Sequence, residues 1–167
     1  MLKKQKSRWK LILSTLLFNI IKNSPLGKHK LLKKGVNSYD RLPLLHLPEL
    51  KELKDYFQEC INSYSNRFNL GNLKLEGNWF NLMETNGQTL IHDHSGSNSV
   101  LSGAYYPLLH KDSCNLTFIS PYRNEEFTLN LKENYLYIFP SWLKHKTNIN
   151  KGPLRITLSF NAPLVSL

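Results

Sequence analysis

The stretch HDHSGSNSVLSGAYY, from His92 to Tyr106, carries the strongest fold signal in the sequence. It opens with two histidines two positions apart and continues into an apolar run typical of a β-strand. Alternate side chains of a strand share a face, so His92 and His94 can converge while Asp93 points the other way. Neutral imidazoles are ligands for iron, zinc, copper and nickel. The stretch therefore predicts part of a metal site on a strand.

Short strand-like runs separated by turn residues fill the chain from Leu73 onward. Eight runs are predicted, over residues 75–84, 89–94, 99–109, 115–120, 126–132, 134–142, 144–149 and 154–162. Many short strands at this spacing are typical of a sandwich or a jelly roll and not of a parallel βαβ sheet.

A helix is predicted over residues 48–64, ahead of the strands. Pro48 suits its first turn, and apolar residues recur at helical spacing along one side. They are Leu50, Leu53, Phe57, Cys60, Ile61 and Tyr64. We therefore expect a mainly β fold with flanking helices, in which N-terminal helices pack on the major sheet.

The positive charge of the chain is concentrated at its N-terminus. The formal net charge is +10, and residues 1–35 hold ten Lys and Arg with no Asp or Glu. The remaining basic and acidic residues balance, which predicts a basic arm over 1–35 followed by one domain over 36–167. Such an arm could contact an anionic partner, that is, nucleic acid, a membrane surface or an acidic protein, or could simply be a solvated terminus.

Neither a membrane span nor a disulfide framework is predicted. The apolar segment Trp9–Ile21 is interrupted by polar residues, is too short to cross a bilayer and lacks a cleavage site, so a packed or interfacial helix is favoured. Cys60 and Cys114 are far apart, which favours buried thiols and a reducing compartment, the cytoplasm.

His145 is the best candidate for a third metal ligand. It follows an aromatic strand that ends at Pro140, whereas His29, His46 and His110 have no evident metal partner. Ten positions later comes Arg155, the one charged residue of the closing strand. Strand alternation puts Arg155 on the same face as Thr157, and a guanidinium on the inside of a barrel requires an anion.

Four segments together resemble the iron(II)- and 2-oxoglutarate-dependent oxygenases, and more narrowly a small group of these enzymes from bacteria and phages. The segments are WFNLM (79–83), HDHSGSNSVLSGAYY (92–106), IFPSWLKH (138–145) and RITLSFN (155–161). The resemblance covers about residues 74–163 and implies a double-stranded β-helix. It also implies an oxygenase that binds Fe(II) and the small co-substrate 2-oxoglutarate, hydroxylates a further substrate, and releases succinate and CO2.

The same resemblance implies the site residues. His92, His94 and His145 match the metal ligands, and Arg155 with Thr157 matches the element that binds the distal carboxylate of 2-oxoglutarate. Tyr106 matches a tyrosine of the prolyl hydroxylases that faces the same carboxylate, and Asn81 is a candidate hydrogen-bond partner of the co-substrate. The wider superfamily has Asp or Glu at position 94, so zinc or nickel competes with iron here.

Two alternatives stay open at this stage. Cupins also use H-x-H, and a metal-binding cupin could serve as an isomerase or a sensor. Against it, the glutamate that cupins carry shortly after the pair is absent, since Asn98 and Ser99 stand there, and Arg155 is left without a role. The other alternative is a non-catalytic barrel.

Overall fold

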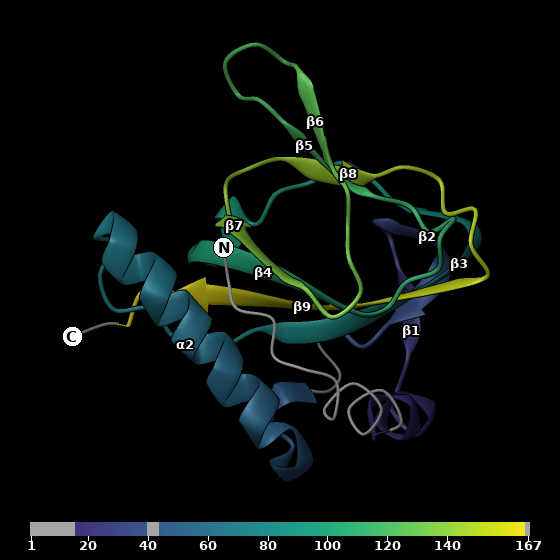
Figure 1. Ribbon diagram of the computed structural model, residues 1–167, viewed down its shortest axis with the longest axis horizontal. Helices are drawn as coiled ribbons and strands as arrows, with labels where there is room; N and C mark the ends of the chain where they lie inside the picture. The colour runs from purple at the N-terminus through teal and green to yellow at the C-terminus, as the bar shows by residue number, and fades with distance from the viewer. Residues whose placement is uncertain (1–15, 40–43, 166–167) are drawn as a thin grey trace.

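Two antiparallel sheets form the body of the protein, which the computed structural model describes over residues 16–39 and 44–165. The six-stranded sheet has the order β1-β2-β3-β9-β4-β7, and the three-stranded sheet has the order β6-β5-β8. The strands are β1 (Gly27–His29), β2 (Leu32–Asn37), β3 (Asn78–Thr89), β4 (Ser99–Leu108), β5 (Leu116–Ile119), β6 (Glu126–Leu129), β7 (Leu136–Pro140), β8 (His145–Thr147) and β9 (Leu154–Pro163). The small sheet faces the large one across the middle of the molecule (Figure 1), as expected for a double-stranded β-helix.

Strand β9 lies at the centre of the large sheet, between β3 and β4. It pairs Asn81 with Thr157 on one side and Ser102 with Asn161 on the other. Because side chains alternate along a strand, Arg155, Thr157, Ser159 and Asn161 line the space between the sheets, whereas Ile156 and Leu158 turn outward. The predicted division of this strand into a polar inner and an apolar outer face is confirmed.

The long helix α2 (Lys51–Phe68) covers the outer face of the large sheet (Figure 1). A 3-10 turn, Pro48–Leu50, leads into it, and Asn69 ends it in the left-handed conformation. Phe57 is fully buried, and its ring lies 5.4 Å from the ring of Phe160. The predicted apolar stripe and its contact with β9 are both confirmed.

The described part of the basic N-terminal segment belongs to this body. Residues 16–22 are helical and place Leu17 and Ile21 in the same core as α2. The segment 27–37 forms the hairpin β1–β2, which extends the large sheet beside β3. A separate arm would therefore be confined to residues 1–15, which lie outside the described residues together with most of the segment Trp9–Ile21.

Strand β3 is longer than the sequence predicted. It runs through Gly87, which marks a bulge rather than a turn: the pairing with β2 jumps from Lys33–Gln88 to Gly35–Met83. A Cβ at Gly87 would lie 2.7 Å from the carbonyl oxygen of Lys34, so the close approach requires glycine. Beyond the bulge the pairing with β2 resumes at Gln88 and Thr89, and the strand ends there, just before the histidine pair.

Two further expectations concern membrane-spanning helices and the two cysteines. No helix in the described part of the chain is long and apolar enough to span a membrane. Cys60 and Cys114 are both buried and free, as predicted.

Candidate metal centre

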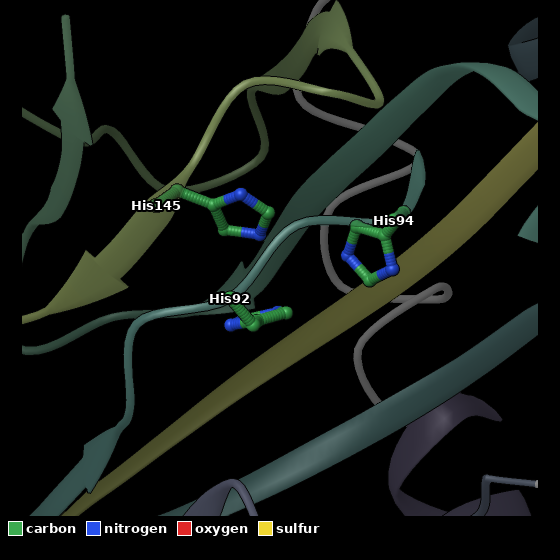
Figure 2. A group of neighbouring side chains, drawn as sticks. All are labelled: His92, His94 and His145. Carbon is green, nitrogen blue, oxygen red and sulfur yellow. The ribbon is translucent and has the colours of Figure 1, made fainter. Parts of the chain in front are cut away.

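Three histidines from two segments meet between the sheets. His92 and His94 lie in the extended segment after β3, and His145 begins β8. One ring nitrogen of each lies within 4.8 Å of those of the other two, and Figure 2 shows the three rings turned toward a common point. The ring centroids are 4.3 Å apart for His92 and His145 and 5.0 Å apart for His92 and His94. This geometry could hold one metal ion.

Backbone carbonyls fix the orientation of two of these rings. Nδ1 of His92 lies 2.8 Å from the carbonyl oxygen of Leu90, and Nδ1 of His145 lies 2.9 Å from that of Leu143. A carbonyl can only accept, so each Nδ1 carries the proton and donates. The lone pair of Nε2 is then available in both rings, which is the tautomer that a metal ligand needs.

The site keeps its histidines neutral. Burial, together with the neighbouring imidazoles, lowers the pKa of His145 to about 3 and that of His94 to about 4. Burial also lowers the pKa of His92. Neutral imidazole is the form that binds metal, so the site is prepared for an ion at neutral pH.

The Asp93 carboxylate is not a member of this cluster. It accepts hydrogen bonds from the backbone N–H of Ser95 at 3.1 Å and from the Ser95 hydroxyl at 2.6 Å. These bonds lower the pKa of Asp93 and tie the carboxylate to the 3-10 turn Ser95–Ser97. The described acidic and histidine residues thus offer a cluster of three imidazoles and no carboxylate at this point.

The residues predicted to bind the co-substrate line the same cavity as the histidines. The cavity has a volume of about 430 Å³, and Arg155, Thr157, Tyr106 and Asn81 all contribute to its walls. The guanidinium carbon of Arg155 lies 4.9 Å from the centre of the Tyr106 ring. Burial raises the pKa of Tyr106 to about 12, so its hydroxyl keeps its proton and remains a donor. The Asn81 side-chain oxygen accepts from Asn37 at 3.3 Å.

Two buried polar atoms in this cavity have no hydrogen-bond partner among the described residues: Nε of Arg155 and Oγ1 of Thr157. Arg155 is only 3% exposed. It takes part in neither ion pair of the described residues, Lys51–Asp55 or Lys146–Glu126. An unpaired buried cation is costly unless an anion binds to it. The donor set therefore fits a carboxylate ligand such as that of 2-oxoglutarate.

Sequence patterns missed two parts of the cavity wall. One is a row of rings in which His29, Tyr39, Trp79 and His94 follow each other with centroids 5.0 to 5.7 Å apart. Its first member comes from a lysine-rich hairpin whose composition gives no strand signal. The other is Ser102, whose hydroxyl is joined by buried hydrogen bonds to Asn161 of the predicted inner face at 2.9 Å and to Ser141 behind the wall at 2.8 Å. The backbone of Ser141 also accepts from the N–H of His94 at 2.8 Å.

Solved structures with a similar architecture include two prolyl hydroxylases and HygX. A Pseudomonas putida prolyl-4-hydroxylase has a TM-score of 0.72 at 12% identity, over 98% of this chain and 92% of that one. HygX from Streptomyces hygroscopicus, solved with nickel and 2-oxoglutarate bound, has a TM-score of 0.69 at 8% identity, over 96% of this chain and 88% of HygX. The viral collagen prolyl hydroxylase of Paramecium Bursaria Chlorella virus-1 has a TM-score of 0.61 at 14% identity, over 92% of this chain and 91% of the viral enzyme. At these identities the likeness establishes the double-stranded β-helix.

The sequence itself matches one family model. No curated protein sequence matches the chain. The model described as "Putative 2OG-Fe(II) oxygenase" matches residues 77–161, from the start of β3 almost to the end of β9, which is about half of the chain. That span includes all three histidines and Arg155, and it decides between the oxygenase and the cupin interpretations. The chain belongs to the family of iron(II)- and 2-oxoglutarate-dependent oxygenases.

Proposed function

We propose that the protein hydroxylates its substrate with iron(II) bound by His92, His94 and His145, and with 2-oxoglutarate bound by Arg155. The observation that carries this proposal is the buried guanidinium of Arg155, which forms no ion pair among the described residues and whose Nε has no hydrogen-bond partner there. It lies in the cavity that also contains the three imidazoles. A metal site and a carboxylate site within one cavity match the two ends of a five-carbon keto diacid.

Each residue has a defined task in this proposal. Iron(II), when bound, supplies the oxidation in which O2 and 2-oxoglutarate are converted to succinate and CO2 while the substrate gains a hydroxyl group. The fork of Arg155 binds the distal carboxylate with two parallel hydrogen bonds. The hydroxyls of Thr157 and Tyr106 donate to the same carboxylate, and the amide of Asn81 orients the co-substrate.

The three-imidazole ligand set also suits zinc and nickel. We propose iron(II) as the functional ion because the family uses it, and zinc or nickel as ions that can occupy the same ligands. Metal analysis of protein purified without oxygen tests this assignment. Protein that takes up zinc but no iron under these conditions would contradict it.

The decisive experiment is a titration of 2-oxoglutarate into anaerobic, iron-loaded protein. We expect Arg155→Lys to weaken binding because it keeps the charge and loses the fork. Arg155→Ala should weaken binding more, by about 1.5–3 kcal/mol for each charge-assisted hydrogen bond lost. Neither variant should lose the metal, since Arg155 is not a ligand.

Two outcomes would contradict the proposal in different ways. Equal binding to the wild type and Arg155→Ala would remove Arg155 from the co-substrate site. The protein could instead bind 2-oxoglutarate tightly and release no succinate in air, whether or not candidate substrates are added. That result would favour the non-catalytic barrel.

We further infer that the basic segment 1–35 contacts an anionic partner and that the protein works in the cytoplasm. Ten cations without an acidic residue support the first inference, and two buried free thiols support the second. Deleting residues 1–8 should lower binding to anionic surfaces in a salt-dependent way and leave metal binding intact.

A further inference from the structure

The fixed charges on the cavity wall are unequal. Three basic residues line it, Lys30, Lys146 and Arg155, and one acidic residue, Asp93. Lys146 forms an ion pair with Glu126, and the Asp93 carboxylate is bound by Ser95. Lys30 is exposed at the cavity and has no ion-pair partner among the residues that the structure describes. Apart from the Lys146–Glu126 pair, the wall thus holds two cations, Lys30 and Arg155, and one anion, Asp93.

The ligand set adds to this excess. Three neutral imidazoles leave the full double charge on a divalent ion, whereas a carboxylate ligand would reduce it by one unit. The double negative charge of 2-oxoglutarate balances the ion, and the Arg155 guanidinium then remains uncompensated. With Lys30 and the Asp93 carboxylate both counted, the loaded site carries about one net positive charge, a field that attracts anions.

The turn between β1 and β2 holds Lys30 at the wall of the cavity that contains the metal centre. The N–H of Leu90 donates to the carbonyl oxygen of Leu31 at 2.8 Å, and the Leu90 carbonyl in turn accepts from His92. The N–H of Leu31 donates to Nδ1 of His29 at 3.3 Å. That bond puts the proton of neutral His29 on Nε2, so the ring adds a second hydrogen-bond donor to this part of the wall.

We propose that the substrate of this oxygenase carries an anionic group, a phosphate or a carboxylate, which Lys30 and His29 bind at the mouth of the cavity. The row of rings formed by His29, Tyr39 and Trp79 leads from this point to His94. A substrate anchored at the turn therefore extends along Trp79 to the metal centre. This inference rests on the proposed function, because the charge balance assumes a bound divalent ion and 2-oxoglutarate.

The test uses full-length protein loaded with zinc, which does not react with oxygen. Binding of 2-oxoglutarate is measured first by calorimetry, in the wild type and in Arg155→Ala. Inorganic phosphate and acetate are then titrated separately into the 2-oxoglutarate-saturated protein. Backbone amide resonances of residues 29–31 report binding, and the stronger of the two anions identifies the source of the charge.

We expect saturable shifts in the wild type and a loss of affinity of roughly fivefold in Lys30→Gln. Lys28→Gln and Lys33→Gln are matched controls, because both lysines are exposed on the same hairpin and neither lines the cavity. They should bind the anions as the wild type does. Equal losses in all three variants, or no response to either anion, would overturn this inference alone. Failure of 2-oxoglutarate to bind would overturn it together with the proposed function.

Discussion

His92 and His145 face each other as an isolated antiparallel β-bridge. The N–H of His92 donates to the carbonyl oxygen of His145 at 3.0 Å, and the N–H of His145 donates back at 2.9 Å. Two ligands of the proposed metal site are thus fixed to each other by the backbone before any ion binds. The site needs little rearrangement on binding, which favours affinity.

Removal of one of these ligands should strongly weaken metal binding. We expect His145→Ala to lower the affinity for divalent iron or zinc by more than about 100-fold, because only two protein ligands remain. His110→Ala is the control, since His110 is exposed and lies outside the cavity. Metal content after dialysis against a weak chelator measures the effect. Equal content in the two variants would refute the ligand assignment.

The hydroxyl of Tyr106 should matter for the co-substrate. Tyr106→Phe keeps the ring against Arg155 and removes one donor, so 2-oxoglutarate should bind about 1 kcal/mol more weakly, with unchanged metal content. The neighbouring Tyr105 is a matched control: its hydroxyl donates to Asn134 at 2.9 Å, and its ring packs on Phe57 on the other face of β4. If Tyr105→Phe weakens binding as much as Tyr106→Phe does, the effect is not specific to the site.

The metal-free protein should lose stability as the pH falls. An unfolded histidine takes up a proton near pH 6.5, whereas His94 and His145 in the folded protein do so only near pH 4 and 3. The unfolded state therefore binds more protons between these limits, and the free energy of unfolding decreases from about pH 6.5 downward. Urea denaturation at several pH values measures the slope.

A variant separates this effect from general acid denaturation. His145→Gln removes one titrating group, so its stability should depend less steeply on pH between 6.5 and 4 than that of the wild type. Parallel curves for the two proteins would show that the buried histidines do not cause the slope.

The outer face of the large sheet is packed without spare room. A Cβ at Gly103 would lie 2.1 Å from Cζ of Phe160, which is fully buried against Phe57. We expect Gly103→Ala to lower the free energy of unfolding by about 1–3 kcal/mol, as overpacking does. Gly96→Ala is the control, because no atom lies within 4 Å of its added Cβ. Thermal and urea denaturation compare the two. A wild-type stability for Gly103→Ala would contradict the packing.

The sequence predicted most of the fold because its signals are local. The helix before the strands shows its apolar stripe, and the alternation from Leu154 to Ala162 predicts both faces of β9. It missed β1 and β2 because lysine-rich residues have low strand propensity and these strands form only by pairing with β3. It divided β3 at Gly87, since a glycine required by a bulge looks the same in sequence as one in a turn.

The site was predictable to the extent that it depends on family motifs. His92, His94, His145 and Arg155 all stand in matched segments, and the cavity contains all four. Lys30 and His29 come from outside those segments and reach the cavity through long-range sheet pairing. No local pattern marks such residues, so the part of the wall that faces the substrate required the three-dimensional structure.

The two faces of β9 link catalysis to folding within one strand. Insertion of a single residue before Arg155 would reverse the alternation, so that the guanidinium would enter the apolar contact with α2 and Ile156 would enter the cavity. The loss of core packing and the loss of the anion site would then occur together. The alternation of inner and outer residues along β9 is therefore required both for core packing and for the anion site. Insertions and deletions are tolerable in the loops on either side of this strand but not within it.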